Sequence, residues 1–91
     1  MVLQMIKFGK ILNSRPAGRE AVLRVKQIIN GSNDDKDIVL DFSSVELLTP
    51  SFADEFISGL KDLYKNKTVK LQGFENNPVI KDTLFALGFF N

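Results

Sequence analysis

The chain has 91 residues, of which 44% are hydrophobic and 25% are charged, and it contains no Cys, no His and no Trp. This length suits one small domain with a modest core, for which eight Phe and one Tyr supply aromatic side chains. The missing Cys and His exclude serine-histidine-aspartate triads, thiol nucleophiles, zinc fingers and CxxC redox pairs. Twelve Lys and Arg against eleven Asp and Glu give a net charge of +1, which is too balanced to indicate a nucleic-acid partner.

The sequence also lacks the features of a membrane or secreted protein. No run of 18 apolar residues occurs, so we expect no membrane-spanning helix and no membrane partner. Residues 1–10 lack the basic start and apolar stretch of a secretory signal peptide. We therefore expect a cytoplasmic protein.

The first half of the chain predicts two strands and a helix. Residues 2–8 alternate in the manner of a strand, and Ile11 and Leu12 predict a short second strand after a turn at Gly9. Pro16 breaks the pattern and disfavours a helical Arg15. A helix is predicted over residues 17–29, ended by Asn30-Gly31. Its apolar positions are Ala21, Val22, Val25, Ile28 and Ile29.

The second half alternates strands and helices. Residues 38–42 form a short apolar run typical of a central strand covered on both faces. Thr49, as N-cap, and Pro50 begin a second helix, for which Ser51 is an alternative cap. Residues 67–74 predict another strand, and Asn77-Pro78 begins a third helix. The apolar stripe of the second helix is Phe52, Phe56, Ile57, Leu60, Leu63 and Tyr64, and that of the third is Val79, Ile80, Leu84, Phe85 and Leu87.

This order predicts a single α/β domain over residues 1–91. We expect a small mixed, largely parallel sheet of three or four strands with three helices, because strands that alternate with helices become parallel neighbours joined by right-handed crossovers. Three amphipathic helices cannot cover both faces of so short a sheet. The helices are therefore expected on one face.

The segment 38–56 carries the most specific pattern: a strand, a tight turn and a hydroxyl at a helix start. Leu40-Asp41-Phe42-Ser43-Ser44-Val45 and Thr49-Pro50-Ser51-Phe52-Ala53-Asp54-Glu55-Phe56 resemble the STAS domain family, the fold of bacterial anti-sigma factor antagonists. They resemble a smaller STAS-like family of unassigned function more closely. The resemblance implies a STAS-like fold and a non-enzymatic bacterial regulatory protein that binds a protein partner, such as a GHKL-type ATPase or kinase.

Ser51 is the first candidate site residue. In the antagonists, a Ser at the start of the equivalent helix is phosphorylated by the kinase-like anti-sigma factor, and Ser51 is the residue here that matches it. Small residues, typically Gly-Leu-Gly, follow that Ser in the antagonists, whereas Phe52, Ala53 and Asp54 follow it here. The N–H groups of a helix start favour a phosphate, but Asp54 opposes one. Ser51 is thus a helix cap or a phosphorylation site.

The expected partner-binding surface comprises Ser43, Ser44, Thr49, Ser51, Asp54 and Glu55. Asp54 and Glu55 either stabilise the helix through its dipole or contact a basic partner. Arg15 and Arg19 stand at the start of the first helix, where cations oppose the dipole. They are either solvated side chains or contacts for an anion or an acidic partner.

Two further hypotheses concern other residues. Asp34, Asp35 and Asp37 lack the turn Gly and closing Glu of a calcium loop, so we expect no metal and no cofactor. Phe89 and Phe90 either close the edge of the core or form a homodimer contact.

An alternative function is an immunity- or inhibitor-type protein that blocks one target through a fixed acidic face. A hydrolase that uses Asp41, Asp54 or Glu55 is disfavoured, because so small a sheet offers little concavity. The protein is therefore expected not to be an enzyme.

Overall fold

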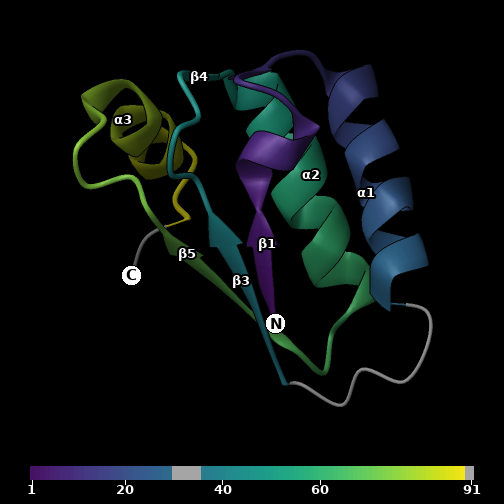
Figure 1. Ribbon diagram of the computed structural model, residues 1–91. Helices are drawn as coiled ribbons and strands as arrows, with labels where there is room; N and C mark the ends of the chain where they lie inside the picture. Colours follow the sequence, from purple (N-terminus) through teal and green to yellow (C-terminus); the bar gives the residue numbers. More distant parts are fainter. Residues whose placement is uncertain (30–35, 90–91) are drawn as a thin grey trace.

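The computed structural model describes residues 1–29 and 36–89, to which all structural statements below refer (Figure 1). The described residues form three α-helices and five short strands, in the predicted order except for two additional elements, the 3-10 helix η1 (Met5–Phe8) and the strand β4 (Leu47–Leu48), which the sequence pattern did not predict. They are β1 (Val2–Gln4), the 3-10 helix η1 (Met5–Phe8), β2 (Ile11–Leu12), α1 (Arg15–Ile29), β3 (Asp37–Asp41), β4 (Leu47–Leu48), α2 (Pro50–Leu63), β5 (Thr68–Gln72) and α3 (Pro78–Ala86).

The strands form two sheets. One has three strands in the order β1-β3-β5, and the other pairs β2 with β4. Every described strand pair is parallel, so the α/β class is confirmed, whereas the mixed single sheet is not. The short β2 is not part of the main sheet. It pairs instead with β4, which lies on the segment that leads into α2.

Helices α1 and α2 cover one face of the three-stranded sheet, whereas α3 contacts α2 and β4 (Figure 1). Leu3, Ile38 and Leu40 point into the core and are buried, whereas the alternate side chains of all three strands are partly or fully exposed. The expected placement on one face is confirmed for α1 and α2. The prediction that residues 38–42 are covered on both faces is wrong, because Val39 lies on the open face and is only half-buried.

The first strand is shorter than predicted. Its last residue, Gln4, pairs with Asp41, the last residue of β3, so the chain has no partner strand beyond this point. Met5 therefore begins η1 and is fully buried. Gly9, at a φ of 133°, ends η1 and donates its N–H to the carbonyl of Ile6 at 3.0 Å.

Helix α1 begins two residues before the predicted start. The chain changes direction at Ser14, which has a φ of 81°, rather than at Arg15. The hydroxyl of Ser14 accepts the N–H of Ala17 at 3.3 Å. Arg15 is therefore helical, contrary to prediction, because Pro16 is tolerated in the first turn of a helix. Ile28 was predicted to be buried, but it is exposed and borders a surface hollow beside β1. The proposed stop at Asn30-Gly31 lies outside the described residues.

The predicted starts of the other two helices are confirmed. The hydroxyl of Thr49 accepts the N–H of Phe52 at 3.4 Å, and Pro50 is the first residue of α2. The side-chain carbonyl of Asn77 accepts the N–H groups of Val79 and Ile80, and Pro78 is the first residue of α3. The apolar stripes were predicted too broadly: Leu63, Val79 and Phe85 are exposed.

Helices α1 and α2 lie side by side in Figure 1 and contact each other closely. Phe52 and Phe56 of α2 are buried between the helices and the sheet, and the ring of Phe56 lies 5.8 Å from that of Phe8. Gly18 of α1 faces the backbone of α2, and a Cβ added there would lie 2.9 Å from the carbonyl oxygen of Phe52. This glycine brings the start of α1 against the start of α2.

Candidate functional site

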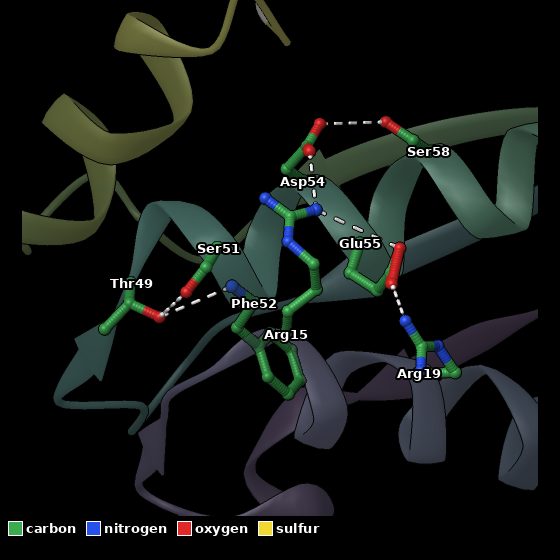
Figure 2. Close-up of polar contacts among 8 residues, drawn as sticks. All are labelled: Arg15, Arg19, Thr49, Ser51, Phe52, Asp54, Glu55 and Ser58. Atoms are coloured by element: carbon green, nitrogen blue, oxygen red, sulfur yellow. Dashed lines mark hydrogen bonds and ion pairs between the residues drawn. The ribbon is translucent and has the colours of Figure 1, made fainter.

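Thr49 joins the starts of the two helices. Its hydroxyl oxygen caps α2 and also accepts the N–H of Ser14, just before α1, at 3.2 Å. The same hydroxyl lies 3.4 Å from the carbonyl of Leu12 in β2. Thr49 is half-buried and holds the α2 start in place (Figure 2).

Ser51 lies in the first turn of α2 and is half-buried. Its Oγ lies 3.4 Å from the Oγ1 of Thr49 (Figure 2). Since Thr49 accepts the N–H of Phe52, the N-cap of α2 is Thr49 and not Ser51. Ser51 thus remains partly exposed to solvent, and its hydroxyl does not cap the helix.

The predicted arginines and carboxylates meet each other. Arg15 Nη1 lies 2.9 Å from Asp54 Oδ2 and 4.0 Å from Glu55 Oε2, and Arg19 Nη2 lies 3.0 Å from Glu55 Oε1 (Figure 2). Ser58 donates its hydroxyl to the other oxygen of Asp54 at 3.3 Å. We call Arg15, Arg19, Asp54 and Glu55 the ion-pair cluster. It joins α1 to α2 beside Ser51.

The ion-pair cluster balances two pairs of opposite charges at the surface. The side chains of Arg15 and Asp54 are 48% and 45% exposed, so water screens their attraction. Asp54 and Glu55 lie beyond the first turn of α2, so the prediction that they stabilise the helix through its dipole is wrong, whereas Arg15 lies in the first turn of α1 and opposes the dipole there. The carboxylates of α2 therefore offset the unfavourable position of Arg15.

Asp41, Ser43 and Ser44 form the turn after β3. One carboxylate oxygen of Asp41 accepts the hydroxyl of Ser43 at 2.6 Å and its N–H at 2.9 Å, and the other accepts the side-chain amide of Gln72 at 3.2 Å. The hydroxyl of Ser43, followed by its N–H, lowers the pKa of Asp41. Asp41 therefore organises this turn and ties the end of β5 to β3.

The exposed hydroxyls of Ser43 and Ser44 border a wide, open hollow of about 510 Å³. Ser44 has a φ of 72°, and the side chain of Asn77 donates to the carbonyl of Val45 at 3.1 Å, which holds the loop against the start of α3. The hollow lies at the carboxyl end of the parallel sheet, the edge at which α/β sheets place ligands. Its other polar side chains are Glu46, Asn76 and Asn77.

The remaining predicted residues lie elsewhere. Asp37 pairs with Lys70 at 3.1 Å, while Asp34 and Asp35 are outside the described residues. Phe89 packs against the core with Lys61 Nζ 5.1 Å from its ring centre, and Phe90 is outside the described residues. Within the described part of the chain, no three His, Cys, Asp or Glu side chains gather as metal ligands would. None of the described helices has the length and apolar character needed to cross a membrane.

Comparison with known proteins identifies a family. A family model described as a STAS-like domain of unknown function matches residues 21–77, which is more than half of the chain. The match runs from the middle of α1 to the N-cap of α3, so it includes Asp54 and Glu55 but not Arg15 and Arg19. No curated protein and no solved structure matches the chain.

Proposed function

Because the chain belongs to the family of STAS-like domains of unknown function, we propose that it is a regulatory module that binds another protein through the start of α2. The proposed docking surface comprises Ser43, Ser44, Thr49, Ser51, Asp54 and Glu55. The observation that carries the proposal is the state of Ser51: it is only partly buried at the helix start, and Thr49 caps the helix.

The start of α2 suits a phosphate on Ser51. The first N–H groups of a helix lack helical acceptors, and the helix dipole is positive at this end. Both effects favour an anion. A phosphate on Ser51 would therefore be stabilised by the backbone of the element that carries it.

The ion-pair cluster removes the main argument against phosphorylation. Side chains three and four residues apart are neighbours on a helix, so Asp54 and Glu55 would repel a phosphate on Ser51. Arg15 and Arg19 offset these two carboxylates through ion pairs of 2.9 and 3.0 Å. Phosphorylation would convert a charge-balanced surface into a negative one, which changes its fit to a partner.

The partner that we propose is a GHKL-type ATPase or kinase, on the strength of the resemblance of the β3–α2 segment to the anti-sigma factor antagonists. The test incubates the chain with a purified GHKL-type ATPase of the source organism and Mg-ATP. Intact-mass spectrometry should show one added phosphate on the wild type and none on Ser51→Ala.

Ser58→Ala is the matched control, because Ser58 is a half-buried hydroxyl on the same helix that bonds to Asp54. It should be phosphorylated like the wild type. A phosphate that persists on Ser51→Ala would contradict the assignment of Ser51. Failure of every such ATPase of that organism to modify the chain would contradict the choice of partner.

Binding measurements separate this proposal from an inhibitor with a fixed acidic face. A switched module should bind its partner about tenfold more weakly as Ser51→Asp than as the wild type. An inhibitor should bind equally well in both forms. The arginine partners of Asp54 and Glu55 favour the switched module, because they leave this surface without uncompensated acid.

A further inference from the structure

The outer backbone edge of β5 pairs with no strand of residues 1–29 and 36–89. Thr68 donates its N–H to the carbonyl of Lys36 at 2.8 Å, and the carbonyl of Gln72 accepts the N–H of Phe42 at 2.9 Å. Backbone groups alternate in direction along a parallel strand, so the N–H and C=O of Val69 and Leu71 point away from β3. No strand among the described residues pairs with this outer side, which Figure 1 shows at one edge of the sheet.

The same edge leaves apolar side chains incompletely covered. Val69 and Leu71 are the register partners of Ile38 and Leu40 on β3. Ile38 and Leu40 are 0% exposed, whereas Val69 and Leu71 are only partly buried although they point to the same face of the sheet. An added strand would cover their exposed surface and satisfy their outward backbone groups at once.

The charges around the edge indicate which kind of strand it fits. Lys65 and Lys67 directly precede β5, and residues 65–72 contain no Asp or Glu. Lys70 lies within β5 but is already paired with Asp37 of β3 at 3.1 Å. Two copies that paired their β5 edges would bring these lysines together, which is unfavourable. A strand that carries carboxylates would instead be attracted.

We propose that the outer edge of β5 binds an extended, acidic segment of another protein as a fourth strand of the sheet. Apolar side chains of that segment cover Val69 and Leu71, and its carboxylates lie near Lys65 and Lys67. The surface shares no residue with the start of α2, so the proposal does not depend on the regulatory function proposed above.

The first test uses a synthetic acetylated peptide with two Glu followed by alternating Val and Thr, added to the isotope-labelled full chain. Amide hydrogen exchange at Val69 and Leu71 should slow about tenfold or more. Val2 and Gln4 provide an internal control, because they hold the outward groups of the opposite edge strand, β1. Their exchange should not change.

A peptide with Lys in place of Glu is the matched control, and it should bind about tenfold more weakly. Equal binding of the two peptides would overturn the charge argument. Unchanged exchange at Val69 and Leu71, or equal protection of the β1 amides, would overturn the assignment of the edge. The lysines would then serve only to keep the edge solvated.

A backbone variant tests the same contact from the side of the protein. Chemical synthesis of the chain with N-methylated Leu71 removes one outward N–H donor but keeps the side chain and the bonds to β3. This change should lower the affinity of the chain for the acidic peptide by up to about tenfold. If the synthetic chain does not fold, Lys65→Glu combined with Lys67→Glu should reverse the preference between the two peptides. An unchanged preference would contradict the proposal.

Discussion

Two regions border the same core but differ in how well they are covered. The contact between α1 and α2 is closely packed, whereas the outer edge of β5 is partly exposed. At the first, Gly18 meets the backbone of α2, and the hydroxyl of Thr49 joins the two helix starts. At the second, Val69 and Leu71 are partly exposed, and their backbone groups lack partners within the described chain. The closed side fixes the candidate site at the α2 start, whereas the open side leaves room for an added strand.

The largest expected effect separates the central strand β3 from the edge strand β5. Leu40→Ala should lower the free energy of unfolding by about 2–5 kcal/mol, because it leaves a cavity at a fully buried position. Leu71→Ala on the register-paired strand should cost about half as much, because part of that side chain is already in water. Urea denaturation measures both. Equal losses would show that β5 is packed as tightly as β3.

A second comparison concerns two glycines of the closed side. Gly18→Ala should cost about 1–3 kcal/mol, because its Cβ would press on the carbonyl oxygen of Phe52 in the facing helix. Gly59→Ala meets only a methyl group of Val22, at 3.0 Å, and gains up to about 1 kcal/mol of helix propensity. In thermal unfolding, the melting temperature of Gly18→Ala should therefore be well below that of Gly59→Ala. The reverse order would mean that α1 and α2 can shift apart.

Loss of an arginine should have a smaller effect. Arg15→Ala removes the contacts to Asp54 and Glu55, which lie at the surface, and should cost less than about 1 kcal/mol. Lys70→Ala removes the single pair with Asp37 on the open face and should cost less still. Urea denaturation in low and high salt checks both values. A cost of Arg15→Ala that does not fall with salt would argue against an electrostatic origin.

The smallest effect concerns the tie between β3 and β5. Folding lowers the pKa of Asp41, so its carboxylate stabilises the fold above the unfolded-state pKa, and this stability is lost as the pH falls through the folded-state value. Ser43→Ala removes the main cause and should raise the pKa of Asp41, as measured by a carbon-13 NMR titration. Ser44→Ala is the control and should leave the pKa unchanged. An unchanged pKa in Ser43→Ala would assign the effect to the backbone N–H.

Local signals in the sequence predicted much of the fold. The pairs Thr49-Pro50 and Asn77-Pro78 each begin a helix where expected, because a cap and a proline act through neighbouring residues. The end of β1 was missed because it depends on the length of β3, which lies more than thirty residues further along the chain. The exposure of Val39 was missed for a similar reason: an apolar run does not show how many faces of its sheet are covered.

The candidate site was predicted in part. The place of Ser51 at a helix start follows from local pattern, but the contact of Arg15 with Asp54 joins residues 39 positions apart. One signal points towards it: Gly18 lies between Arg15 and Arg19 inside a helix, where a glycine often marks a close approach. Side chains that flank such a contact must meet the opposing helix. The edge position of β5 has no comparable signal, because an edge strand and a central strand of this length look alike.

The parallel pairing of every described strand has a consequence for how the chain folds. Val2 pairs with Val39 and Ile38 pairs with Val69, so each ladder of the main sheet closes over a long stretch of chain that contains a helix. No short hairpin is available to start the sheet, and closing long loops is entropically costly. Refolding after dilution from urea should therefore gain helical signal before the sheet assembles, and should be slower than for a helical bundle of equal length.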